Sequence, residues 1–451
     1  MRKKTDKNIK FNVELPPFVK TILERLRQHN FMAYVVGGAL RDVILGRGII
    51  DWDISTNADT GEIKSVFSDT RHYSLKHETV TLVKPGNHFE ITTMRGKGSP
   101  ELNINTDLNH RDFTINAMAY DDINGIILDP HDGRIDIEKK IVRGVLDPEK
   151  RFLEDPLRML RAVRIAAELG FKIENKTLNC ISINSELLKS VSVERIRDEF
   201  LRILLAERPS RPLNILRKTG LLKEIIPELL EGYRKKQNKW HRYTIYRHVM
   251  EAIDHIPSTP VLRLAALLHD IAKPRVREKI NGEFHFYNHE KASAGIAKEI
   301  MERLRFSNEE VRKVTSIVSL HMIDYNSSWS DGAVRRLMKR AGNDIDDLIR
   351  LRRADIQAHG IEHNEYVILD ELEHRIKQVG GKKSALRISD LAVDGKKIMN
   401  ILNLKQGPDV GNILNRLHEM VIDDPDFNTE ERLIEFLLEA REENRIRSIC
   451  K

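Results

Sequence analysis

The segment from Tyr34 to Thr56 constrains this chain more than any other, because two glycines, a basic residue and two carboxylates fall within one short stretch. Its valines predict a short buried strand that ends at Gly37 and Gly38, and the following residues, ALRDVIL, have the spacing of a helix. Glycines at such a junction let backbone N–H groups approach an anion, and the helix N-terminus adds a partial positive charge. The segment therefore predicts an anion site, with Arg41 one turn into the helix.

The two carboxylates of this segment are spaced for a shared task. Asp51 and Asp53 lie in an extended, β-branched context, so alternation along a strand turns both to the same face. Hard divalent cations such as Mg²⁺ prefer oxygen ligands of this kind. A Gly-Gly pair alone is common in turns, and Asp-x-Asp alone is common in solvated loops. Their order of strand, turn, helix and strand indicates a single site for a phosphate and metal ions.

This order of motifs resembles the DNA polymerase β-like nucleotidyltransferases, which are marked by GG or GS followed by D-x-D. The resemblance implies an α/β head with a small mixed sheet and helices. It implies phosphoryl transfer with two Mg²⁺ ions at Asp51 and Asp53. It also implies that the nucleotide is bound by Gly37, Gly38 and Arg41. Glu90, in the predicted strand HFEITTMR, is a candidate for the third carboxylate that is common in this superfamily.

The segment from His110 to Ala117, HRDFTINA, narrows the family. It resembles the RRDFTINA segment of class II tRNA nucleotidyltransferases and bacterial poly(A) polymerases, with His110 where an arginine is commoner. Arg111 can offer a planar five-donor fork to phosphate or sugar oxygens, and Asp112 can accept from a ribose hydroxyl. Read alone, an Arg-Asp pair before an apolar run also fits a helix cap. The resemblance assigns both residues to nucleotide binding.

A third motif, Glu154 to Arg158, precedes a clear helical periodicity and predicts a helix from Asp155 to Leu169. Asp155 and Arg158 are three apart, so this helix would place both on one face, where they could pair with the edge of a base. The motif resembles the EDxxR of class II tRNA nucleotidyltransferases, which select CTP or ATP without a nucleic-acid template. A surface ion pair is the competing interpretation. The resemblance also assigns Arg161 to nucleotide binding, with Glu154 and Arg164 as weaker candidates. Farther on, the charged residues of VERIRDEF, residues 193–200, are expected to brace helices.

Histidines and aspartates in the second half of the chain form another series. An adjacent His-Asp pair ends the apolar helical segment LRLAALLHD, and single histidines precede and follow it. The series resembles the HD metal-dependent phosphohydrolases. The resemblance implies a transition metal held by His248, His269, Asp270 and Asp355, with His289 and His321 available for a second metal or a phosphate. It implies phosphatase or phosphodiesterase activity, for instance on 2′,3′-cyclic phosphates, although HD folds also serve as RNA-binding scaffolds in this family.

The pattern of elements predicts four domains. They are an α/β nucleotidyltransferase head at 1–140, an all-α base-selecting neck at 141–232, an HD body at 233–380 and a helical tRNA-binding tail at 381–451. Strands are expected at 34–36, 52–55, 80–83, 88–93 and 126–128. In the tail, Gly407, Pro408 and Gly411 precede a helix, and they fit either a phosphate contact to tRNA or a plain helix-capping turn.

Composition agrees with this domain assignment. Lys and Arg number 75 against 68 Asp and Glu, a net charge of +7 that suits a polyanionic partner such as tRNA. The two cysteines, Cys180 and Cys450, are too far apart to suggest a disulfide framework, so a reducing cytoplasm is the expected location. The N-terminal residues have no apolar core of a signal peptide, and no run approaches the length of a membrane span.

These features together predict a tRNA nucleotidyltransferase that adds a 3′-terminal CC, or the full CCA, from CTP and ATP. The segment 96–110 between two family motifs is short and lacks the basic pattern of the flexible loop in CCA-adding members. This favours CC addition alone, with a separate A-adding enzyme as partner. Two alternatives remain, an HD phosphohydrolase with an RNA-binding head and a poly(A) polymerase, although relatives of the second usually lack an intact HD series.

Overall fold

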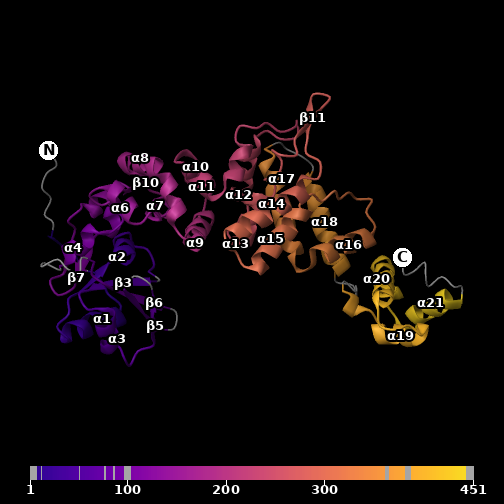
Figure 1. Cartoon of the computed structure of the whole chain (residues 1–451), viewed down its shortest axis with the longest axis horizontal. Coiled ribbons are helices and arrows are strands. Elements are labelled where there is room, and N and C mark those ends of the chain that lie inside the picture. Colours follow the sequence, from indigo (N-terminus) through magenta and orange to yellow (C-terminus); the bar gives the residue numbers. More distant parts are fainter. Residues whose placement is uncertain are drawn as a thin grey trace. The chain divides into compact units, whose positions relative to one another are not determined.

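The computed structural model describes residues 8–11, 13–49, 51–75, 78–84, 87–95, 103–360, 365–380 and 387–442. The chain forms two compact units, Met1–Pro227 and Glu228–Lys451 (Figure 1). The division between the units falls close to the predicted start of the HD body. The finer division into four domains stays a prediction. No helix in the described ranges is both long and apolar enough to cross a lipid bilayer.

An eight-stranded mixed sheet forms the centre of the first unit. Its spatial order is β1-β8-β7-β2-β3-β6-β5-β4, and β3 and β6 run parallel while the other neighbours are antiparallel. The strands are β1 Asn8–Lys10, β2 Ala33–Val36, β3 Asp51–Thr56, β4 His72–Leu75, β5 Thr79–Lys84, β6 Asn87–Thr93, β7 Ala119–Asp121 and β8 Ile126–Leu128. The five expected strands are all present, and β1, β4 and β7 are additional.

Helices of the first unit lie around the sheet and then continue as a neck. Those within the head are α1 Pro17–Gln28, α2 Gly37–Ile44, α3 Thr60–Val66, α4 Ile104–Asn109 and α5 Gly133–Glu138. The neck contains α6 Pro148–Glu154, α7 Arg158–Leu169, α8 Asn175–Asn184, α9 Val193–Leu204, α10 Ser210–Lys218 and α11 Leu221–Ile225. A short parallel pair, β9 Ile141–Val142 and β10 Lys172–Ile173, accompanies the expected neck helices.

The second unit is built almost entirely from helices (Figure 1). They are α12 Ile245–His255, α13 Pro260–Leu268, α14 His289–Arg303, α15 Asn308–Leu320, α16 Asp331–Ala341, α17 Ile345–Ala358, α18 Glu365–Gly380, α19 Gly395–Leu402, α20 Pro408–Asp423 and α21 Glu430–Glu442. One hairpin, β11 Glu278–Ile280 and β12 Glu283–His285, interrupts them. Asn281 and Gly282 both have positive φ, as a two-residue hairpin turn requires.

The last three helices have an apolar core of their own, formed mainly by isoleucine, leucine and valine side chains. This core includes Val393, Ile398, Ile413, Leu417, Val421, Leu433 and Leu437. Ion pairs fasten α20 to α16, with Arg336 Nη2 2.6 Å from Asp423 Oδ2 and Lys339 Nζ 2.9 Å from Glu419 Oε1. The tail therefore has its own apolar core and is held to α16 by charged contacts.

Candidate functional site

Three carboxylates meet on one face of the head sheet. The parallel register of β3 and β6 sets Asp53 beside Glu90, and Asp51 beside His88. Because strand side chains alternate, Asp51, Asp53 and Glu90 project to the same face. Trp52, between the two aspartates, is only 4% exposed and packs on the opposite face. The expected strand spacing of the two aspartates is present, and the neighbouring strand brings the third carboxylate to them.

The electrostatics of this trio are those of a cation site. Burial raises the pKa of Asp53 above its usual value, against the lowering effects of the Arg111 charge and two backbone N–H groups. Burial also raises the pKa of Glu90, and the negative charges of Asp53 and Asp51 add to this rise. Close carboxylates destabilise each other's ionised forms. A divalent cation among them would relieve the repulsion.

The start of α2 holds one of these carboxylates in place. Gly38 N donates to Asp53 Oδ2 at 2.9 Å, and Ala39 N lies 3.4 Å from the same oxygen. Gly37 has a φ of +70°, and a Cβ atom there would lie 2.5 Å from Asp53 Oδ2. The backbone N–H groups that the sequence suggested for phosphate binding are thus engaged with Asp53 in this structure.

Acidic neighbours hold the two head arginines that were predicted to bind nucleotide. Arg41 Nε donates to Asp42 Oδ1 at 3.0 Å, and its Nη1 donates to Asn116 Oδ1 at 2.9 Å. Arg111 Nη2 donates to Asp107 Oδ2 at 2.9 Å. The Nη1 atom of Arg111 lies 3.1 Å from where a Cβ of residue 37 would be, which places this guanidinium beside Asp53. Each guanidinium is therefore oriented before any ligand binds.

Asp112 is buried and fully engaged with protein donors. Its Oδ2 accepts from Arg161 Nε at 2.9 Å and Nη2 at 2.7 Å, and its Oδ1 accepts from Phe113 N at 2.8 Å and Asn116 Nδ2 at 3.2 Å. Burial alone would raise the pKa of Asp112, but the charge and hydrogen bonds of Arg161 hold it well below its usual range. A ribose contact to Asp112 would require one of these bonds to rearrange.

The predicted helix from Asp155 to Leu169 is wrong at its start. α6 ends at Glu154, α7 begins at Arg158, and Asp155 is extended with φ −150° and ψ 99°. The physical reason is Pro156, because a proline disfavours the helical conformation of the residue before it. Asp155 and Arg158 therefore do not share a helix face in this structure, although they flank the same short turn.

Each residue of this pair has other partners. Arg158 is buried, and it donates to Glu154 Oε2 at 2.9 Å and to the carbonyls of Arg151 and His110, each at 3.1 Å. The Asp155 carboxylate accepts from Arg195 Nη2 at 2.8 Å.

The neck helices are also fastened by arginines. Arg164 Nε lies 2.6 Å from Glu199 Oε2, so this weaker candidate ties α7 to α9. Arg195 was expected only to brace helices, yet it reaches the predicted base-reading carboxylate, Asp155. The sequence held one indication of this contact. Arg195 lies four residues before Glu199 in α9, so both side chains lie on the face of α9 toward α7.

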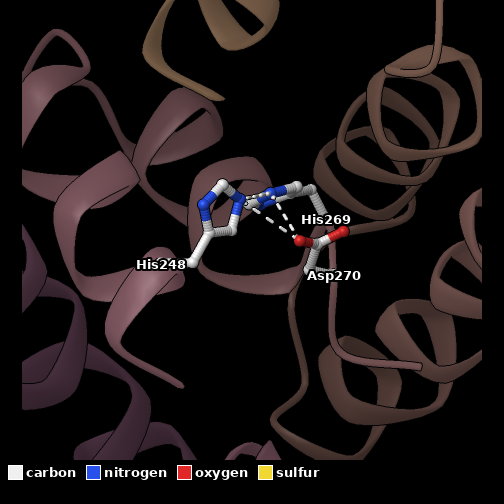
Figure 2. A group of neighbouring side chains, drawn as sticks. All are labelled: His248, His269 and Asp270. Atoms are coloured by element: carbon white, nitrogen blue, oxygen red, sulfur yellow. Dashed lines mark hydrogen bonds and ion pairs between the residues drawn. The ribbon is translucent and has the colours of Figure 1, made fainter. Parts of the chain in front are cut away.

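A second group of ligand-type residues lies in the second unit, and all of its members are buried. Two overlapping sets have the proximity that a metal ion requires, the first comprising His248, His269 and Asp270 and the second comprising Asp270, His289 and His321. In the first set, the two imidazole Nε2 atoms and Asp270 Oδ2 lie 3.3 Å from one another in every pairing. Figure 2 shows these three side chains converging on one point.

These separations match those of atoms bound to one ion. Two ligands at a tetrahedral angle, each about 2.0–2.1 Å from a metal, are about 3.3–3.4 Å apart. Asp355 Oδ1 extends the first set, 2.9 Å from His248 Nε2 and 3.5 Å from His269 Nε2. The other oxygen of Asp270, Oδ1, lies 3.4 Å from His289 Nε2 and 3.7 Å from His321 Nε2. The structure thus brings together all six predicted HD residues around Asp270.

Backbone carbonyls fix the orientation of all four imidazoles. His248 Nδ1 donates to Ala358 O, and the Nδ1 atoms of the other three donate to carbonyls at 2.7–2.9 Å, those of Ala266, Val318 and Phe286. A carbonyl can only accept, so each Nδ1 carries the proton and each Nε2 of a neutral ring presents a lone pair. Lone pairs that face each other at 3.3 Å require a cation between them, either a proton or a metal ion.

Buried groups around this cluster point to the metal ion. Among the described residues, neither Asp270 Oδ1 nor the Nε2 of His289 has a hydrogen-bond partner. Burial lowers the pKa of His321 to about 3, which keeps this imidazole neutral as metal ligation requires. Burial also disfavours the charged form of His269, but the charges and hydrogen bonds of Asp270 and Asp355 raise its pKa to about 10, so this ring would release a proton when a metal ion binds. The sequence missed Lys273, whose Nζ lies 2.7 Å from Asp270 Oδ2, and His359, whose Nε2 lies 3.6 Å from Asp355 Oδ1. Lys273 follows Asp270 by three residues, and this spacing was the indication in the sequence that its side chain could reach Asp270.

Comparisons with known proteins match four family models to the chain. Residues 33–143 match the family model "Poly A polymerase head domain", and 170–232 match "Probable RNA and SrmB-binding site of polymerase A". Residues 215–357 match "HD domain", and 288–437 match "tRNA nucleotidyltransferase domain 2 putative". The HD match includes all six predicted metal ligands, and it ends at residue 357, two residues before His359.

Whole-chain relatives give the same result. The chain is 30% identical over 428 residues to a CCA-adding enzyme of Lactococcus lactis, covering 89% of this chain and 92% of the relative. It is 31% identical over 426 residues to that of Ligilactobacillus salivarius, with 92% and 94% coverage. A crystal structure of the Bacillus stearothermophilus CCA-adding enzyme in complex with CTP superposes with a TM-score of 0.70 at 27% identity, covering 96% of this chain and 99% of that one. The chain therefore belongs to the family of CCA-adding enzymes, which are tRNA nucleotidyltransferases.

Proposed function

We propose that the head of this chain transfers nucleotides from CTP to the 3′ end of tRNA by a reaction that uses two Mg²⁺ ions. The observation that carries this proposal is the register of β3 and β6, which gathers Asp51, Asp53 and Glu90 on one face beside the N-terminus of α2. The similar Bacillus stearothermophilus enzyme is known in complex with CTP, which supports the choice of nucleotide.

The three carboxylates would hold the metal ions. Bound Mg²⁺ supplies activation of the attacking hydroxyl and neutralises the pyrophosphate leaving group. The protein's own part is to fix the ligands, and the N–H groups of Gly38 and Ala39 do this for Asp53. Arg111 would contact the triphosphate, and its hydrogen bond to Asp107 beside the carboxylates supports this role. This positioning lowers the conformational entropy lost when the nucleotide binds.

Base selection is proposed for Asp155 and Arg158. The Nη1 and Nη2 atoms of Arg158 donate hydrogen bonds to protein acceptors, and Nη2 donates only one. Among the described residues, no acceptor binds its Nε. Arg195 donates a hydrogen bond to the carboxylate of Asp155 and so fixes its position. A carboxylate that accepts and a guanidinium that donates complement the Watson–Crick edge of a base. We infer that the base enters between them after a small change of side-chain rotamers.

The product of the reaction is at least the two cytidines. The short segment 96–110 supports CC addition alone, although residues 96–102 lie outside the described part and 104–109 form α4. The names of the relatives, CCA-adding enzymes, support the addition of A as well. The test is to incubate purified enzyme with tRNA that ends at the discriminator base and with labelled CTP and ATP. The length of the labelled product distinguishes CC from CCA addition.

The catalytic assignment is tested with Asp51→Asn and Asp53→Asn. Each variant should lose CTP incorporation while binding tRNA within about twofold of wild type in a gel shift, because the carboxylates act on the metals more than on RNA affinity. Asp69→Asn, an exposed change in the same unit, is the matched control and should keep activity. Turnover retained by both site variants would refute the assignment.

We further propose that the second unit is a metal-dependent phosphohydrolase. The supporting observation is the set of four imidazoles whose Nε2 atoms converge on the two oxygens of Asp270. Imidazole and carboxylate together suit a transition metal such as Mn²⁺, Co²⁺ or Ni²⁺. His248, His269, Asp270 and Asp355 would hold one ion, and Asp270, His289 and His321 are available for a second. A bound metal would supply an activated water as nucleophile at neutral pH.

Calorimetric titration of the metal-free protein with Mn²⁺ should give two ions per chain in the second unit. His269→Ala should lose at least one of them, together with hydrolysis of bis(p-nitrophenyl) phosphate and of 2′,3′-cyclic nucleotides, while CTP addition persists. His255→Ala is the matched control, because His255 ends α12, is exposed and lies outside the cluster. Simultaneous loss of both activities in His269→Ala would instead mean that the cluster is structural.

A further inference from the structure

Two segments that lie outside both sites share an unusual composition. They are residues 232–242, GYRKKQNKWHR, and residues 277–287, REKINGEFHFY, which contain the hairpin of β11 and β12. Together they hold seven Lys and Arg against two Glu, a net charge of +5 in 22 residues, whereas the whole chain carries +7. We call them the basic aromatic surface. A polyanion is the partner that such a charge attracts.

Contacts join the two segments into one surface. Lys239 Nζ lies 3.0 Å from Glu283 Oε1, which links the first segment to β12. Figure 1 shows the hairpin projecting from the helices of the second unit, so one face of it is open to solvent. Ile280, on β11, is 41% exposed, in agreement with this position.

Two aromatic side chains of this surface, Trp240 and Tyr287, are well exposed, and each lies beside a cation or another ring. Trp240 is 55% and Tyr287 60% exposed. Lys239 Nζ lies 5.4 Å from the Trp240 ring centre, and the rings of His285 and Tyr287 stack at 5.5 Å with an interplanar angle of 9°. Exposed ring faces next to cations are the pattern by which proteins bind single-stranded nucleic acid, since bases stack on the rings and phosphates meet the cations.

The surface continues into the cluster around Asp270. Gln237, in the first segment, accepts from Lys273 Nζ at 3.1 Å, and the same Nζ lies 2.7 Å from Asp270 Oδ2. In the second segment, Phe286 O accepts from His289 Nδ1 at 2.8 Å. The first segment therefore reaches Asp270 through one residue, Lys273, and the second contacts the predicted ligand His289 directly. The surface thus borders the cluster, whose own residues are buried.

We propose that the basic aromatic surface binds single-stranded RNA and delivers it to the cluster around Asp270. The second unit would then act on an RNA strand in preference to a free nucleotide. This choice of substrate rests on the proposed phosphohydrolase, whereas RNA binding by the surface does not. A duplex would use the positive charge but not the exposed rings, so stacking separates the proposal from duplex binding. A membrane surface could use both the charge and the rings, and vesicle binding in the test below separates it from RNA.

The test compares Trp240→Ala/Tyr287→Ala with Tyr73→Ala in the full-length protein. Tyr73 lies in β4 of the first unit and is 46% exposed, so its variant controls for the loss of an exposed ring. Fluorescence anisotropy with a labelled single-stranded RNA of about 12 nucleotides should show at least a tenfold rise in Kd for the double variant. The control should stay within twofold. A base-paired RNA of the same length should bind both alike, and circular dichroism checks that each variant is folded.

Crosslinking locates the RNA and separates the outcomes. A 4-thiouridine-substituted RNA should crosslink to peptides that contain Trp240 or Tyr287. The inference is overturned by crosslinks confined to residues 1–227, by equal Kd values for the double variant and the control, or by an equal loss of binding to anionic phospholipid vesicles. If the RNA binds and crosslinks as expected but bis(p-nitrophenyl) phosphate is not cleaved with Mn²⁺, the phosphohydrolase fails and the RNA surface stands. If the ester is cleaved but the double variant binds RNA normally, the surface fails alone.

Discussion

Replacing Gly37 with alanine should disable the head by displacing one carboxylate. The new Cβ would lie 2.5 Å from Asp53 Oδ2, whereas ordinary contacts begin near 3.4 Å. Asp53 Oδ2 must therefore retreat by about 0.9 Å, which also lengthens its bond from Gly38 N. A misplacement of about 1 Å in a catalytic constellation costs about 100-fold in rate, or about 2.7 kcal/mol of transition-state stabilisation.

Two other glycines separate the causes. Gly46 has a φ of +65°, and an added Cβ there would have no atom within 4 Å, so Gly46→Ala adds the backbone strain alone, about 1–2 kcal/mol of stability. Gly38 has no positive φ, and its added Cβ would meet Arg41 Nη2 at 3.5 Å and Asp53 Oδ2 at 3.6 Å, both ordinary contacts. We expect kcat/KM for CTP to change less than about twofold in Gly46→Ala and less than about tenfold in Gly38→Ala.

The assay is steady-state incorporation of labelled CTP into tRNA that lacks its 3′ end, with thermal unfolding of each variant as a check on the fold. The reasoning is wrong if Gly37→Ala keeps kcat/KM within threefold of Gly46→Ala, because the close approach to Asp53 would then have no catalytic consequence. Equal large losses in Gly37→Ala and Gly38→Ala would instead locate the effect at the phosphates, where both glycines would lie.

The remaining predictions concern base choice, acid stability and the product. Arg158→Lys keeps the charge but loses the fork, so misincorporation of UTP and GTP against CTP should rise at least tenfold, and unchanged discrimination would contradict the proposed template. The lowered pKa of Asp112 means that its pairing with Arg161 stabilises the fold above about pH 3.8 and that this contribution is lost as the pH falls below it. Asp112→Asn should therefore cost about 2 kcal/mol of unfolding free energy at pH 7, with a difference from wild type that shrinks below about pH 3.8 in urea titrations. Grafting a longer loop from a CCA-adding relative into 96–110 should restore terminal A if the wild-type product ends in CC, whereas efficient A addition by wild type refutes the CC-only hypothesis.

Local patterns in the sequence predicted strands of the head sheet but not which strands pair with each other. A period of two was enough to place Asp51 and Asp53 on one face of a strand. The pairing of β3 with β6 joins residues that are about 37 apart in sequence, and no local preference specifies it. Glu90 could therefore be named only through a family resemblance, and its position beside Asp53 had to come from the structure.

Two differences between the predicted and observed elements have local causes in the sequence. The helix expected from Asp155 ignored Pro156, which moves the residue before it out of the helical region. The hairpin of β11 and β12 was not expected, although Asn281 and Gly282 form one of the strongest short signals for a two-residue turn. Arg195 is different, because its contact with Asp155 depends on how α9 packs against α7, and that packing cannot be read from either helix alone.

The imidazoles around Asp270 show why ligand types can be read from a sequence while their arrangement cannot. The last carbonyls of a helix have no partner within the helix. Ala266, Val318 and Ala358 lie in the last turns of α13, α15 and α17, and each of their carbonyls accepts from the Nδ1 of a histidine. Two of these histidines directly follow the helix that they cap, which is a local signal, whereas His248 reaches the end of α17 from another helix. The same bonds that satisfy the helix ends turn each Nε2 toward Asp270, so the fold of the second unit and the orientation of its ligands have one physical cause.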